Sequence, residues 1–231
     1  MAPPRLLLLP GLLLDERLYA AQVEALRPQC APQVVVLTQD DSIAAMAERV
    51  LAAAPERFAL CGLSMGGYVA FEIMRRAPER VTRLALLDTQ ARLDSAEARA
   101  RRRDLIALAE RGAFAAATAR LLPLLVHPDR RQDAALGATI GAMAERVGRE
   151  GFLRQQTAIL NRIDSRPGLA DIACPTLVLT GRQDVLTPLE VHLEIAAAIP
   201  AATLVVLPNC GHLSPLEQPA MVNAQLAAWL A

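Results

Sequence analysis

The strongest constraint on the fold is the segment 57–68, which reads Arg-Phe-Ala-Leu-Cys-Gly-Leu-Ser-Met-Gly-Gly-Tyr. An apolar run over residues 58–61 ends in Gly62-Leu63-Ser64-Met65-Gly66, and a helical pattern follows over residues 68–76. This order predicts a strand, a sharp turn and a helix, with Ser64 at the turn. Glycine two residues before and after the serine lets the backbone segments come close, because glycine has no Cβ.

The position of Ser64 predicts that it is a nucleophile. Its hydroxyl would stand beyond a strand end and at the start of a helix, where backbone N–H groups favour negative charge. The pattern Gly-x-Ser-x-Gly also arises by chance, so a glycine-rich turn that only packs is the alternative. The rest of the chain has to decide between the two interpretations.

The composition excludes several classes of protein. The chain has 231 residues, of which 53% are hydrophobic, so it can bury a substantial core and is not disordered. Basic and acidic residues balance at 24 each, which favours neither nucleic acid nor a membrane surface as a partner. Four scattered cysteines without a Cys-x-x-Cys pair indicate no metal site and no disulfide framework. We therefore expect no cofactor and a reduced, cytoplasmic protein.

The N-terminal residues 1–14 superficially resemble a signal peptide, with one early positive charge and an apolar run. However, Pro10-Gly11 interrupts this run, and Asp15-Glu16-Arg17 ends it without a small-residue cleavage site. No apolar stretch reaches the roughly 18 residues needed to span a bilayer. We expect neither export nor a membrane span.

Short apolar runs alternate with helical patterns along most of the chain. Strands are expected at residues 5–9, 33–38, 58–61, 81–87, 176–180 and 203–207. Helices are expected at residues 18–26, 42–53, 65–76, 189–198 and 215–230. Near-continuous apolar strands between helices predict an α/β fold with a doubly wound, mostly parallel sheet.

Residues 92–166 break this alternation with helical patterns alone, at 95–111, 113–121, 129–147 and 149–161. We predict a helical cap at 92–166, inserted into a core formed by residues 1–91 and 167–231. Leucines on its apolar faces are expected to cover Ser64 and to favour apolar esters over charged ones. The arginines at 99 and 101–103 are expected to form a solvated helix face; alternatively, one points inward to bind a carboxylate or phosphate.

A nucleophilic serine needs a base, and the base needs an acid that orients it. His212 follows the last expected strand, and Asp184 follows the one before it, so both should project from the same sheet edge as Ser64. Asp88, which also follows a strand, is the rival acid. Of the other histidines, we expect a cap or loop hydrogen bond for His127 and a solvated helix surface for His192.

A developing oxyanion needs two hydrogen-bond donors. The backbone N–H of Met65, directly after the serine, is the first candidate. The second should come from the loop after the first strand, where Gly11 allows a close approach, and Leu12 is the candidate there.

The order Ser64, Asp184, His212, with Gly-Leu-Ser-Met-Gly-Gly, Gly-Arg-Gln-Asp and Gly-His-Leu-Ser-Pro-Leu-Glu around them, resembles the α/β-hydrolase superfamily over nearly the whole chain. Within it, the chain is similar to small bacterial hydrolases with a helical cap. The resemblance implies a sheet of about six strands that begins at the family's third strand. It departs from the family where Pro10-Gly11 replaces the usual His-Gly of the oxyanion loop.

These features predict a serine hydrolase that cleaves a small ester, thioester or lactone through an acyl-enzyme on Ser64. The same resemblance also covers carbon–carbon hydrolases, lyases, cofactor-free haloperoxidases and ligand-binding members without turnover. A dehalogenase is disfavoured, because its nucleophile would be a carboxylate. The expected partner is a small molecule with a carbonyl group, and the oligomeric state is left open.

Overall fold

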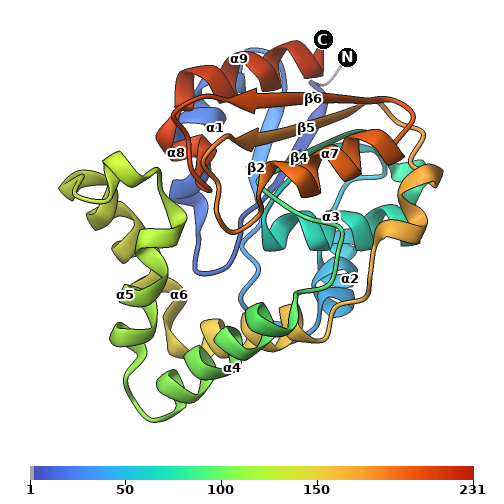
Figure 1. Ribbon diagram of the computed structural model, residues 1–231. Coiled ribbons are helices and arrows are strands. Elements are labelled where there is room, and N and C mark those ends of the chain that lie inside the picture. The colour runs from blue at the N-terminus through green and yellow to red at the C-terminus, as the bar shows by residue number, and fades with distance from the viewer. Residues whose placement is uncertain (1–2) are drawn as a thin grey trace.

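All the strands of the computed structural model, which describes residues 3–231, run parallel in one sheet (Figure 1). They are β1 (Arg5–Leu9), β2 (Ala31–Val34), β3 (Phe58–Leu63), β4 (Val81–Leu87), β5 (Thr176–Gly181) and β6 (Ala202–Leu207). Their order across the sheet is β2-β1-β3-β4-β5-β6, and every neighbouring pair is parallel. The predicted α/β fold with a six-stranded sheet is confirmed.

Helices cover both faces of the sheet, which is why its central strands are apolar throughout. One face carries α2 (Ile43–Ala53), α3 (Met65–Arg76) and α7 (Leu189–Ala198), and the other carries α1 (Ala20–Leu26), α8 (Ser214–Glu217) and α9 (Pro219–Leu230). Successive residues of β1 point to opposite faces, as in any strand. Leu7 and Leu9 join the α2–α3–α7 side, while Leu6 and Leu8 join the α1–α9 side.

Three further helices are inserted between β4 and β5: α4 (Ala96–Glu110), α5 (Phe114–Leu125) and α6 (Ala134–Leu160). They lie on the side toward which β5 and β6 point, so they face the carboxyl edge of the sheet (Figure 1). The expected helical insertion is thus present, and its division from the core at residues 92 and 166 stays a prediction.

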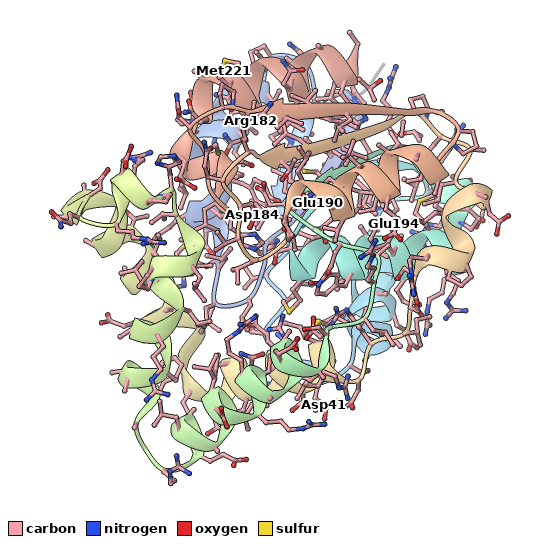
Figure 2. The ribbon with its side chains drawn as sticks, in the orientation of Figure 1. Asp41, Arg182, Asp184, Glu190, Glu194 and Met221 are labelled. Atoms are coloured by element: carbon pink, nitrogen blue, oxygen red, sulfur yellow. The ribbon has the colours of Figure 1, made fainter. Side chains whose placement is uncertain are left out.

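The two ends of the insertion lie side by side at its base. The Ser165 N–H donates to the Ala91 carbonyl at 2.9 Å. Nearby, the Arg92 guanidinium pairs at 2.7 Å with Glu194, which projects from α7 (Figure 2). The insertion also has a small buried cluster of its own, which includes Phe152 and the Leu13 side chain from the loop after β1.

Among the predicted elements whose bounds differ in the structure are the edge strand and the last helix. The edge strand β2 begins at Ala31 rather than 33, because it pairs only with β1, whose first residue Arg5 lies opposite Ala31. Beyond Val35, the short β1 offers no further partner. The expected helix 215–230 is divided into α8 and α9 at Pro219, which has no N–H to continue the first helix.

The predicted division between 129–147 and 149–161 is confirmed, because the backbone of α6 leaves helical geometry at Gly148, with φ of 70°. Residues 128–130 form only a short 3₁₀ turn before it.

The turn between β3 and α3 brings backbone segments very close together. A Cβ built on Gly62 would lie 2.4 Å from the Gly66 carbonyl oxygen, and one built on Gly66 would lie 2.1 Å from the Leu9 carbonyl oxygen. Between them, Ser64 adopts φ of 54° and ψ of −114°, a strained conformation for a residue with a side chain. The glycines therefore let α3 start against the carboxyl end of β1.

We expect Gly66→Ala to lower the free energy of unfolding by about 1–3 kcal/mol or more, because the new methyl group meets backbone atoms that cannot move aside. Gly141→Ala in α6 is the matched control. Nothing lies within 4 Å of a Cβ at Gly141, so alanine there should raise the stability by about 0.5–1 kcal/mol. Urea denaturation of both variants measures these changes, and equal stabilities would contradict the steric explanation.

Candidate active site

Three loops at the carboxyl edge of the sheet bring Ser64, Asp184 and His212 together. The Ser64 Oγ lies 2.9 Å from His212 Nε2, and His212 Nδ1 lies 2.7 Å from Asp184 Oδ2. Asp184 stands on the loop after β5, between the sheet and the inserted helices (Figure 2). Asp184 and His212 are buried, whereas Ser64 is partly exposed. One continuous hydrogen-bonded chain thus joins a buried carboxylate to an accessible hydroxyl.

The Asp184 carboxylate is fixed by its own loop. Its Oδ1 accepts from the N–H groups of Leu186 at 2.8 Å and Thr187 at 3.1 Å, and its Oδ2 accepts from the Thr187 hydroxyl at 2.6 Å. Burial alone would raise the pKa of Asp184, but the charge of His212 and these hydrogen bonds outweigh it and lower that pKa. The carboxylate is therefore ionised at neutral pH and acts only as an acceptor.

His212 is oriented by this carboxylate. Burial opposes its charged form, but the charge and hydrogen bond of Asp184, with a further contribution from Asp88, raise the pKa of His212 above 6.5. In the neutral imidazole, the proton lies on Nδ1, because a carboxylate there can only accept. Nε2 is then free to accept the proton of the Ser64 hydroxyl.

The two expected oxyanion donors flank this serine. Met65 is the first residue of α3, and Leu12 lines the same cleft as Ser64 and His212. Among residues 3–231, neither the Leu12 N–H nor the Met65 N–H donates a hydrogen bond. Both groups are therefore available to a ligand.

Gln155 of α6 holds the loop that carries Leu12. Its Oε1 accepts from the Leu13 N–H at 3.0 Å, and its Nε2 donates to the Leu37 carbonyl at 2.7 Å. Gln155 is fully buried, and Leu13 has φ of 62°. The side chain thus fixes a strained turn next to Ser64. Sequence reasoning missed this residue, because nothing in the pattern of α6 distinguishes Gln155 from its neighbour Gln156.

The cleft above Ser64 is lined by both apolar and polar side chains. The apolar side chains that line it are Leu12, Leu13, Leu14, Leu105, Leu121, Leu125, Ile159 and Leu186. The polar ones beyond the Ser64–His212 pair are Tyr68, Gln90, Asp94, Arg101, Arg102 and Thr187. The predicted solvated arginine face is wrong for Arg102, whose side chain is 20% exposed and pairs with Asp94.

The rival acid, Asp88, lies fully buried beneath the site. Its Oδ1 accepts from the Gly181 N–H at 3.1 Å, and its Oδ2 accepts from the Ser214 N–H at 3.2 Å and the Ser214 hydroxyl at 2.5 Å. It therefore bonds the loops on either side of His212, while Asp184 bonds the imidazole itself. Burial, followed by the charge of Asp184, raises the pKa of Asp88 to about 8.

The other two histidines have structural partners. The Nδ1 of His127 accepts from the Asp129 N–H at 3.2 Å, which confirms the expected loop hydrogen bond. The expectation of a solvated His192 is wrong, because this side chain is fully buried where α7 packs on the loop after β4. Its Nε2 accepts from the Thr89 N–H at 2.9 Å.

Glu217, the last residue of the Gly-His-x-x-x-x-Glu pattern, ties the His212 loop to the insertion. One carboxylate oxygen accepts from the Gly211 N–H at 3.0 Å, and the other accepts from the His127 N–H at 2.7 Å. The N–H of His212 itself donates to the Leu125 carbonyl at 3.2 Å. The end of α5 and the His212 loop are therefore one hydrogen-bonded unit.

Across residues 3–231, no group of three or more His, Cys, Asp or Glu side chains is placed to hold a metal ion. Over the same residues, no helix combines the length and the apolar character needed to cross a membrane.

Residues 27–219 match the family model described as alpha/beta hydrolase fold. The chain therefore belongs to the alpha/beta hydrolase fold family, as its resemblance predicted. Among curated proteins, it is 32% identical over 188 residues to BpoC of Mycobacterium tuberculosis, which bears the name of a non-heme bromoperoxidase. That similarity covers 77% of this chain and 69% of BpoC.

Two solved structures are similar over almost the entire chain. A thermophilic esterase from Thermogutta terrifontis, with malate bound, is 31% identical with a TM-score of 0.88, covering 99% of this chain and 90% of the esterase. The enol-lactonase from Burkholderia xenovorans LB400 is 26% identical with a TM-score of 0.89, covering 100% of this chain and 92% of the lactonase. The hydrolase class is thus supported by relatives of the same size and shape.

Asp88 gives a pH-dependent stability. With its pKa raised from 3.8 to about 8 in the folded chain, its contribution is complete below 3.8 and is lost as the pH rises toward 8. Asparagine cannot titrate, so the stability of Asp88→Asn relative to wild type should increase steadily from pH 5 to pH 8. Urea denaturation across this range measures the difference. The exposed Asp41→Asn is the control, and a difference that is flat or falls with pH contradicts the prediction.

Proposed function

We propose that this protein is a serine hydrolase that cleaves a small ester, thioester or lactone through an acyl-enzyme on Ser64. The observation that carries the proposal is the hydrogen-bonded chain from Ser64 Oγ through His212 to Asp184, which opens into a cleft. It has the form of a nucleophile, a base and an orienting acid. The names of the two similar structures, an esterase and an enol-lactonase, support carbonyl chemistry of this kind.

In the first half of the reaction, Ser64 Oγ attacks the carbonyl carbon while its proton passes to His212 Nε2. The Asp184 carboxylate stabilises the imidazolium that forms. The backbone N–H groups of Leu12 and Met65 donate to the oxyanion of the tetrahedral intermediate. As the intermediate collapses, His212 returns the proton to the leaving alcohol or thiol, and the acyl group stays on Ser64.

In the second half, His212 takes a proton from water, and the resulting hydroxide attacks the acyl-enzyme. The intermediate again places its charge against the two backbone donors. Its collapse breaks the bond to Ser64 Oγ, which recovers a proton from His212, and the carboxylic acid is released. A lactone follows the same course, except that its alcohol group remains attached to the acid.

A cofactor-free haloperoxidase on the same side chains is the second candidate, and the name of BpoC favours it. Bromination of an indicator dye with hydrogen peroxide and bromide, measured beside ester hydrolysis, separates the two. A binding protein without turnover is distinguished by a fluorophosphonate probe, because only an activated serine is labelled rapidly and stoichiometrically.

We expect Ser64→Ala to lower kcat by on the order of 10⁴–10⁶, because the residual rate comes from the oxyanion donors and substrate binding alone. Hydrolysis of p-nitrophenyl esters and fluorophosphonate labelling measure the loss. Ser42→Ala is the matched control: Ser42 caps α2, where its Oγ accepts from the Ala45 N–H at 3.1 Å. That change should cost about 1 kcal/mol of stability and keep the activity. A Ser64→Ala protein with over a tenth of wild-type activity would exclude the assignment.

The two buried aspartates should differ in their effect on catalysis. Asp184→Asn removes the acceptor of the His212 Nδ1 proton, so kcat should fall about 10⁴-fold. Asp88→Asn leaves both hydrogen bonds of His212 in place and should cost far less. A folded Asp88→Asn that is the more damaged variant would reverse the assignment.

In the wild type, kcat/KM should rise with pH and reach half its maximum above pH 6.5, because His212 must be neutral and its pKa is raised.

A further inference from the structure

One wall of the cleft above Ser64 is positively charged. Arg101 and Arg102, which follow one another in α4, line the cleft together with Ser64 and His212. The next residue, Arg103, is exposed and does not line it. The inserted helix thus places only part of its arginine run against the candidate active site.

Arg102 belongs to a buried cluster with unbalanced charge. Its Nε lies 2.6 Å from Asp94 Oδ2, and Arg162 Nη2 lies 2.8 Å from Asp94 Oδ1. The Asp94 and Arg162 side chains are only 1% and 4% exposed. Two guanidinium groups share one carboxylate, so the cluster carries two positive charges and one negative charge, a net charge of +1. Burial makes such an excess costly unless an anion approaches it.

One buried donor beside this cluster lacks an acceptor among the described residues, and the exposed Arg101 directly precedes Arg102 in α4. Gln156 accepts from Arg102 Nη1 at 3.0 Å through its Oε1, while its buried Nε2 has no hydrogen-bond partner within residues 3–231. The Ser95 hydroxyl donates to Glu97, one turn before Arg101, at 2.8 Å. This hydrogen bond and, to a smaller extent, the charge of Arg101 lower the pKa of Glu97.

We propose that Arg101 and Arg102 bind a carboxylate carried by the substrate, with Arg102 held in place by the buried Asp94–Arg162 pair. The proposal rests on the proposed hydrolase function of Ser64 and specifies its substrate class. A guanidinium fork matches a carboxylate in shape and charge. Leu105, one turn after these arginines on α4, and Leu121 also line the cleft, and they suit an apolar chain between this carboxylate and the reacting carbonyl. The substrate is thus an ester or lactone with a remote acid group, in place of the neutral apolar ester expected from the sequence.

Half-esters of linear dicarboxylic acids test this proposal. Monomethyl succinate, glutarate, adipate and pimelate are compared with methyl esters of the neutral acids of equal chain length, with methanol release as the measurement. At one chain length, we expect kcat/KM for the half-ester to exceed that for the neutral ester about tenfold or more. Arg101→Gln should lower this ratio about tenfold, since it removes one charge-assisted partner. Arg103→Gln, from the same helix, is the matched control and should leave the ratio unchanged.

The outcomes separate this proposal from the function on which it rests. Hydrolysis of neutral esters with no preference for any half-ester, or a preference that Arg101→Gln leaves intact, overturns the carboxylate site and leaves the hydrolase standing. If no ester is hydrolysed, the hydrolase proposal fails, and calorimetric titration of monomethyl adipate into Ser64→Ala still tests the site. Binding that weakens about tenfold in Ser64→Ala/Arg101→Gln supports the site, and absent or unchanged binding overturns it.

Discussion

The candidate active site depends on buried carboxyl groups that accept backbone N–H groups at the carboxyl edge of the sheet. Asp88 joins the start of the β5 loop to Ser214, Asp184 closes its own loop onto Thr187, and Glu217 joins Gly211 to the insertion. A loop with unpaired buried N–H groups would be unstable, and a carboxylate can satisfy two or three of them at once. The 2.9 Å approach of His212 to the serine therefore follows from how three neighbouring loops are fixed.

The second constraint is steric and acts on the nucleophile side. Gly62 and Gly66 let α3 begin against β1, and Ser64 accepts a strained backbone as the result. The facing loop is strained as well, at Leu13, and is held by Gln155 from the inserted helix α6. The insertion thus has two roles, since it covers the cleft and also fixes the loop that presents one of the proposed oxyanion donors.

Sequence patterns predicted the elements and their order because apolar periodicity and glycine positions are local signals. They failed where a distant partner decides the outcome. The bounds of β2 depend on where β1 begins, and the burial of His192 depends on the loop after β4, which no pattern in α7 reports. Likewise, Ser64 and His212 both follow strand ends, so the sequence predicted that they lie close together. The position of Gln155 and the inward direction of the Arg102 side chain depend instead on packing between α4, α6 and the loop after β1.

The attachment of the insertion at two places limits how the cleft can open. Its base is joined through Ala91 and Arg92, and its far side is joined to the His212 loop through the Leu125 carbonyl and the His127 N–H. A rigid swing of all three helices would break the bonds that position His212. The helix α4 is itself joined to α6, through Arg99 to the Leu160 carbonyl and through Arg102 to Gln156. The shape of the cleft and the position of the base are therefore coupled, because the same hydrogen bonds hold both.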